Sequence, residues 1–233
     1  MQAGAAEVSV AVAANFGAPM ARLSQAFSAA TGHTLRLSTG ATGKFYSQIV
    51  AGAPFEVLLA ADAETPAKLV AQGLAVPGSA FTYAVGRLVL WSPQPGFVDG
   101  QGAVLATGRF EHLAIANPKL APYGLAAVAV LKAKGLDAAL APKLVMGESL
   151  AQAYQFVASG NAELGFVALS QVAAPGKALS GSIWRVPAAL YPPIRQDAVL
   201  LLPGQGSAAA TALLTYLKSA PAKALIEAWG YGQ

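Results

Sequence analysis

Short apolar runs alternate along the chain with segments whose apolar residues recur at helical spacing. Residues 8–13 (VSVAVA) form a run that is typical of a buried strand. The next segment, 18–31, places Met20, Leu23 and Phe27 on one face of a helix. The same reasoning predicts further strands over 33–38, 55–60, 113–116, 144–146 and 164–169, and helices over 43–51, 125–134, 150–159, 208–218 and 222–229. Alternation of nearly continuous apolar strands with helices predicts an α/β fold whose parallel sheets are covered on both faces.

Two long extended segments interrupt this alternation, at 81–91 and 194–202. Neither follows a helix in the usual strand–helix rhythm, so we interpret them as crossings between two lobes. Residues 1–83 together with 196–233 are then predicted to form the first lobe, and residues 84–195 the second. The C-terminal segment would thus return to the first lobe.

Composition narrows the class of protein. Of 233 residues, 55% are apolar and 11% are charged, against about 25% charged in an average domain, which excludes disorder as a description of the chain. The longest charge-free stretch, 198–217, is cut by Pro203 and Gly204, so it does not read as a membrane span. The net charge is +4, but the basic residues are scattered, and we therefore predict no nucleic-acid binding. The N-terminus lacks a basic and apolar leader pattern, so no signal peptide is expected.

Residues suited to catalysis are sparse. Cys is absent, and His33 and His112 each stand at the start of a predicted strand without a partner nearby in the sequence. No metal-binding spacing or GxSxG motif occurs, and residues 40–44 (GATGK) lack the spacing of a phosphate-binding loop. Asp62 and Glu64 are interpreted as helix-start residues. These observations favour a protein that is not an enzyme, and they give no sign of a metal site.

Four small or polar loops join predicted strands to helices: 13–17 (AANFG), 38–43 (STGATG), 121–124 (APYG) and 146–150 (MGESL). In open α/β sheets, ligands bind at this edge, and helix N-termini offer N–H groups that suit an oxyanion. Asn15 and Thr42 add side-chain donors. Asn, Thr and Ser are also ordinary helix N-caps, which is the competing explanation at each single loop.

The first three of these loops belong to a set of motifs that also includes residues 48–54, 60–62, 116–118 and 164–168, and the resemblance that this set carries covers residues 8–230. On this set the chain resembles the periplasmic molybdate-binding proteins of ABC transporters, the ModA family. The resemblance implies a two-lobed type II periplasmic-binding-protein fold with two crossing strands and a ligand cleft between the lobes.

The resemblance also implies the ligand-binding residues. The first-loop position falls on Asn15 and the second-loop hydroxyl on Thr42, where many relatives have Ser in each case. The backbone donors of the second lobe fall on Tyr123 and Leu150. Some relatives add a Tyr hydroxyl at the position that is Ala168 here, so this donor is missing.

The function implied by the resemblance is capture of molybdate or tungstate by hydrogen bonds and its delivery to the membrane permease of an ABC importer. Such a protein is expected to be a periplasmic monomer without a cofactor. One alternative is the same fold binding sulfate, phosphate or a small organic acid, because helix N-termini do not select one oxyanion. Another is a two-lobed enzyme, for which Glu148 is the only carboxylate in the four loops.

Overall fold

The computed structural model describes residues 5–176 and 178–232, and these divide into two units. Unit 1 holds the described residues through Val85 together with Arg195–Ala228, and unit 2 holds Gly86–Ile194 together with Trp229–Gly232. The expectations for residues 1–4 and 233 lie outside the described part of the chain. Each unit is built around one five-stranded sheet.

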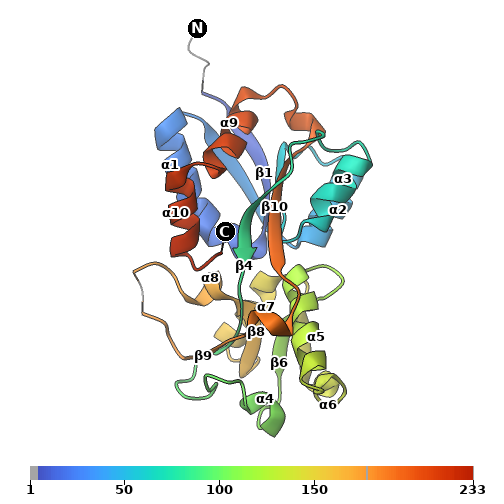
Figure 1. Cartoon of the computed structure of the whole chain (residues 1–233), viewed down its shortest axis with the longest axis vertical. Coiled ribbons are helices and arrows are strands. Elements are labelled where there is room, and N and C mark those ends of the chain that lie inside the picture. The colour runs from blue at the N-terminus through green and yellow to red at the C-terminus, as the bar shows by residue number, and fades with distance from the viewer. Residues whose placement is uncertain (1–4, 177, 233) are drawn as a thin grey trace. The chain divides into compact units, whose positions relative to one another are not determined.

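The sheet of unit 1 has the order β2-β1-β3-β10-β4. Its strands are β1 (Glu7–Ala13), β2 (Thr34–Gly40), β3 (Val57–Leu59), β4 (Phe81–Gly86) and β10 (Ile194–Leu200). Strand β1 pairs in parallel with β2 and β3, whereas β10 runs antiparallel to β3. Helices α1 (Gly17–Thr31), α9 (Ala208–Leu217) and α10 (Ala220–Ala228) lie on one side of the sheet, and α2 (Thr42–Val50) and α3 (Glu64–Ala71) lie on the other (Figure 1). Two 3-10 turns, Ala14–Phe16 and Leu202–Gly204, complete the unit.

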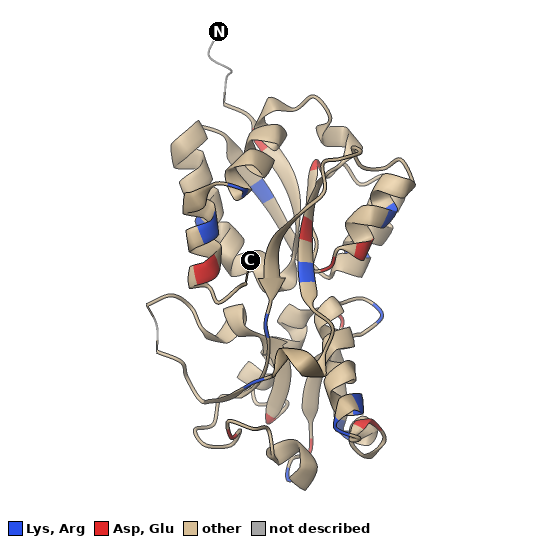
Figure 2. Ribbon diagram, viewed as in Figure 1, with Lys and Arg blue, Asp and Glu red and all other residues tan. Residues whose placement is uncertain are grey.

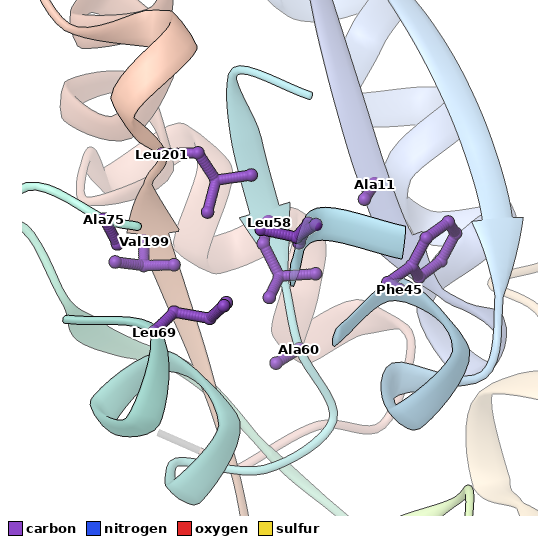
Figure 3. Close-up of a cluster of buried hydrophobic side chains, with 9 residues drawn as sticks. Ala11, Phe45, Leu58, Ala60, Leu69, Ala75, Val199 and Leu201 are labelled. Atoms are coloured by element: carbon purple, nitrogen blue, oxygen red, sulfur yellow. The ribbon is translucent and has the colours of Figure 1, made fainter. Parts of the chain in front are cut away.

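A cluster of buried apolar side chains fixes α2 and α3 against this sheet (Figure 3). Phe45 of α2 packs toward Ala11 and Leu58 of the strands, and its ring also makes a T-shaped contact with Phe55. Leu69 of α3 is fully buried in the same cluster. Burial of this apolar surface holds the N-terminus of α2, and hence Thr42, at one edge of the sheet.

The sheet of unit 2 has the order β7-β6-β8-β5-β9. Its strands are β5 (Leu88–Ser92), β6 (Leu113–Ala116), β7 (Leu144–Gly147), β8 (Leu164–Ala168) and β9 (Ser182–Arg185). Strand β6 is parallel to β7 and β8, and β5 is antiparallel to β8 and β9. The helices are α4 (Val104–Thr107), α5 (Pro122–Ala133), α6 (Asp137–Leu140), α7 (Leu150–Ala158) and α8 (Leu169–Val172), with 3-10 turns at Ala141–Lys143 and Ala188–Leu190.

Helix α7 covers one face of the second sheet. Val157 joins Ala114 of β6 and Val89 of β5 in a buried cluster. The ring of Tyr154 stacks on Trp91 of β5, with 5.3 Å between ring centroids. This packing fixes the N-terminus of α7, which begins at Leu150.

The predicted α/β class is confirmed, with one correction to its sheets: both are mixed rather than parallel. The parallel pairings involve the strands that alternate with helices, and the antiparallel ones involve β5, β9 and β10. Strand β9 and helices α4, α6 and α8 were not predicted; each has only four residues, too few to show a period. The extended segment 81–91 supplies β4 to the first sheet and β5 to the second. Among the described residues, no helix is long and apolar enough to span a membrane.

Candidate functional site

Asn15 lies in the 3-10 turn directly after β1 and is 3% exposed. It does not cap a helix, because the N-cap position of α1 is Phe16 and carries no side-chain cap. Instead, Asn15 Nδ2 donates a hydrogen bond of 2.9 Å to Gln196 Oε1 on β10. The capping explanation therefore does not account for this side chain.

Thr42 is the first residue of α2, one position earlier than the predicted helix start, and is 2% exposed. The N-cap of α2 is Ala41, which has no side chain able to cap. Thr42 Oγ1 accepts a hydrogen bond of 3.0 Å from the Ala61 backbone N–H. Since this bond uses the oxygen as an acceptor, the hydroxyl keeps its own hydrogen as a donor.

The loops that carry Asn15 and Thr42 leave the first sheet at the same edge. Strands β1 and β2 are parallel, and their register pairs Ala13 with Gly40, the last residue of each strand. The first turn of α2 contains no acidic residue, and the Lys44 and Phe45 N–H groups donate to the carbonyl oxygen of its N-cap, Ala41. The positive end of the helix dipole lies at this N-terminus. Unit 1 therefore presents a helix N-terminus and two polar side chains at one sheet edge, an arrangement suited to an anion.

The charged side chains near these loops are either hydrogen-bonded within the protein or exposed to solvent. Asp62 follows Ala61 and accepts a 2.8 Å hydrogen bond from the Thr65 backbone N–H, so it acts as the predicted helix-start residue for α3. Burial raises the pKa of the Asp62 carboxyl, although its two hydrogen bonds with Thr65 oppose this effect. Lys44 is exposed in the first turn of α2. Figure 2 shows Lys and Arg dispersed over both units in this view rather than gathered on one surface.

Unit 2 repeats the arrangement at the end of β6. Helix α5 begins at Pro122, three residues earlier than predicted, with Ala121 as its N-cap and no side-chain cap. Tyr123 therefore lies in the first turn of the helix and is 2% exposed. The next residue must be glycine, because a Cβ on Gly124 would collide with the carbonyl oxygen of Ala116. This close approach fixes the N-terminus of α5 onto the end of β6.

Leu150 is the first residue of α7 and offers a backbone N–H at the helix N-terminus. The preceding residue, Ser149, is a true N-cap, because its Oγ accepts a 3.3 Å hydrogen bond from the Gln152 backbone N–H. In return, Gln152 Oε1 accepts a 2.7 Å hydrogen bond from the Glu148 backbone N–H. Strands β6 and β7 are parallel, with Ala116 paired to Gly147, so the loops of α5 and α7 also share one edge.

Comparison with known proteins identifies the family to which this arrangement of loops and helix N-termini belongs. The model of the bacterial extracellular solute-binding proteins matches residues 8–232. The chain belongs to this family.

The relatives of this solute-binding protein include two molybdate-binding proteins named ModA. That of Azotobacter vinelandii is 62% identical over 230 residues, which cover 99% of this chain and 91% of the relative. That of Rhodobacter capsulatus is 54% identical over 231 residues, covering 99% and 90%. The solved structure of an Azotobacter vinelandii periplasmic molybdate-binding protein matches with a TM-score of 0.95 at 44% identity, over 97% of this chain and 99% of that one. The predicted resemblance and the periplasmic-binding-protein fold are confirmed.

Other residues singled out from the sequence have local structural roles in this solute-binding protein. His33 Nδ1 accepts a 3.2 Å bond from the backbone N–H of Ala6, and the backbone N–H of His112 donates a 2.9 Å bond to Glu163 Oε2. Ala168 ends β8 and brings no hydroxyl; its N–H donates to Gln171 Oε1 at 3.0 Å. Within residues 5–176 and 178–232, no group of three or more His, Cys, Asp or Glu is placed to hold a metal ion.

Sequence reasoning missed Gln196 and Tyr83, which contact the Asn15 side chain or its partner. Gln196 is fully buried, and Tyr83 is 3% exposed. The sequence did carry a signal for Gln196. This residue lies on the same, buried face of β10 as the apolar residues Ile194 and Ala198. A polar side chain in such a position requires buried partners, but the sequence does not identify them.

Proposed function

We propose that this solute-binding protein captures molybdate, and tungstate as its close chemical analogue, for an ABC importer. The observation that carries the proposal is the high identity, over nearly the whole chain, to two proteins named for molybdate binding. The helix N-termini in each unit support it, since their N–H groups suit a tetrahedral oxyanion. The relatives are binding proteins, which supports a transport role rather than catalysis.

The proposed ligand residues are Asn15 and Thr42 in unit 1 and Tyr123 and Leu150 in unit 2. Asn15 and Thr42 donate from their side chains, and Tyr123 and Leu150 donate from the backbone. All four are buried to 3% exposure or less, so bonds to a charged ligand would form with little competition from water. Neutral N–H and O–H donors hold a dianion without a buried cation.

Selection against sulfate follows from the size of the anion. Donors that are set for a larger oxyanion leave a smaller one with longer and weaker hydrogen bonds. Rigid placement of the donors makes this selection effective. In unit 1 the Thr42 hydroxyl is held by Ala61, and in unit 2 α5 is held by the close approach of Gly124 to Ala116.

The cellular setting of the proposal follows the family. Its members are extracellular solute-binding proteins, and we place this one in the periplasm as a monomer that delivers the anion to a membrane permease. No cofactor takes part in the proposed mechanism.

Native mass spectrometry of the purified protein with molybdate, tungstate and sulfate tests the proposal. We expect a monomer that retains one molybdate or one tungstate and that exchanges neither for excess sulfate. Retention of sulfate or phosphate in preference to molybdate would reassign the protein to another oxyanion. A dimer as the binding species would contradict the monomeric part of the proposal.

A further inference from the structure

A buried polar network in unit 1 lies behind Asn15. Asn15 Nδ2 donates to Gln196 Oε1 at 2.9 Å, and the Tyr83 hydroxyl lies 3.0 Å from the same Gln196 oxygen. The Tyr83 hydroxyl is also 3.0 Å from the Ala60 carbonyl oxygen. A phenol has one hydrogen, so Tyr83 shares it between these two acceptors.

Burial and ring packing hold the three side chains of this network in place. Gln196 is fully buried on β10, and Asn15 and Tyr83 are each 3% exposed. The Tyr83 ring packs edge-on against Phe16, the residue after Asn15, with 4.8 Å between centroids. Burying an amide and a phenol is costly unless their hydrogen bonds are made, so each member constrains the others.

This network decides which end of the Asn15 amide acts as the donor. A side-chain amide presents N–H hydrogens at one end and an acceptor oxygen at the other, and rotation by half a turn exchanges them. An oxyanion is bound by the nitrogen end and repelled by the oxygen end. Gln196 Oε1 accepts only from the nitrogen end, and because that nitrogen carries two hydrogens, the bond is compatible with a second bond from the same atom.

We infer that Gln196, held by Tyr83, is a positioning residue that fixes the Asn15 amide with its nitrogen as the anion donor. The inference rests on the proposed function, since Asn15 is a proposed ligand. Gln196 and Tyr83 lie on strands β10 and β4 rather than in any of the four ligand loops, so substitutions there leave those loops unchanged in sequence.

A double-mutant cycle tests the inference, with Gln196→Met, Asn15→Ala and the double variant titrated with molybdate in a calorimeter. Met matches the length of Gln and removes the acceptor. We expect Gln196→Met to weaken molybdate binding about ten-fold in the wild-type background. In the Asn15→Ala background the same change should cost less than about two-fold, because no amide remains to be oriented. An equal loss in both backgrounds would overturn the inference, since a purely structural role does not depend on Asn15.

A matched control comes from the same pair of strands. Thr82 Oγ1 on β4 donates a 2.7 Å hydrogen bond to Asp197 Oδ1 on β10, and this bond is separate from the contacts that join Asn15, Gln196 and Tyr83. Thr82→Val removes this link between the strands, and we expect molybdate affinity to remain within about two-fold of wild type. A loss equal to that of Gln196→Met would indicate that any weakening of the β4–β10 pair lowers affinity, and would overturn the positioning role.

A second variant keeps the inference testable if Gln196→Met does not fold. Tyr83→Phe retains the ring that packs on Phe16 and removes the hydroxyl. It should weaken molybdate binding about three-fold, and this loss should vanish in the Asn15→Ala background. Persistence of the loss without Asn15 would contradict the proposed chain of contacts.

The outcomes separate this inference from the proposed function. If the wild-type protein binds molybdate and the cycle is additive, only the positioning role fails. If the wild type binds sulfate or phosphate instead, the molybdate proposal fails, and the cycle is measured with that anion. If none of the three anions binds, both are overturned.

Discussion

Replacing Thr42 by Val separates the two tasks that the structure gives to its hydroxyl. Val keeps the branched shape and nearly the same volume at a position that is 2% exposed, so packing is preserved. What is lost is the oxygen that accepts the 3.0 Å bond from the Ala61 N–H, together with the hydrogen proposed to bind the anion. The perturbation is therefore chemical rather than steric.

The expected magnitudes differ for the two tasks. Leaving the buried Ala61 N–H without its acceptor should lower the unfolding free energy of the ligand-free protein by about 1–3 kcal/mol. Loss of a hydrogen bond to a charged ligand should weaken molybdate binding by about 1.5–3 kcal/mol, which is roughly ten- to hundred-fold in affinity. The first effect is measured by denaturant unfolding without ligand, and the second by calorimetric titration of the folded protein.

Thr42→Ser is the matched control, because Ser retains the hydroxyl and loses only a methyl group. We expect its molybdate affinity to remain within about three-fold of wild type. Wild-type affinity in Thr42→Val would refute the role of Thr42 as a ligand. Unchanged stability in the same variant would refute the importance of the bond to Ala61.

Three further predictions concern other residues. Tyr123→Phe should leave molybdate affinity within about two-fold of wild type, because the backbone N–H is the proposed donor; a ten-fold loss in titration would assign the phenol instead. Gly124→Ala should lower the unfolding free energy by about 1–3 kcal/mol and weaken molybdate binding, because the new Cβ collides with Ala116. In the control Gly100→Ala the new Cβ meets open space, so thermal unfolding and binding assays should show no change in stability or affinity. Burial raises the pKa of the Asp62 carboxyl, so the folded protein holds this proton more tightly than the unfolded chain does. The contribution of Asp62 to the unfolding free energy therefore falls as pH rises above about 4. Denaturant unfolding measured across pH should show this fall in the wild-type protein and not in Asp62→Asn.

The local parts of the fold could be predicted because their signals are local. Apolar runs and helical periods located β1, β2, β6 and β8 together with helices α1, α2, α5 and α7, and the four loops were found at the ends of the expected strands. The antiparallel neighbours were not predicted, since the pairing of β10 with β3 joins residues far apart in the chain. Such pairings depend on the whole sheet rather than on any short segment.

The candidate site residues also divide into what short segments reveal and what depends on distant contacts. Asn15 and Thr42 could be selected from their loops, but the sequence could not separate an N-cap from another role. The structure does so, because their partners, Gln196 and Ala61, lie 181 and 19 positions away. The residues after α10 are a similar case. Tyr231 lies with unit 2, where its hydroxyl is 2.9 Å from Ser170 Oγ, and no periodic pattern near the C-terminus indicates this contact.

Calorimetric titration with molybdate, with and without excess sulfate, tests the central claim most directly. Trp91, Trp184 and Trp229 provide a parallel fluorescence signal. The proposal predicts tight one-to-one binding whose stoichiometry and heat survive the sulfate. Absence of binding heat, or complete displacement of molybdate by sulfate, would contradict it and leave a periplasmic-binding-protein fold that serves a different anion.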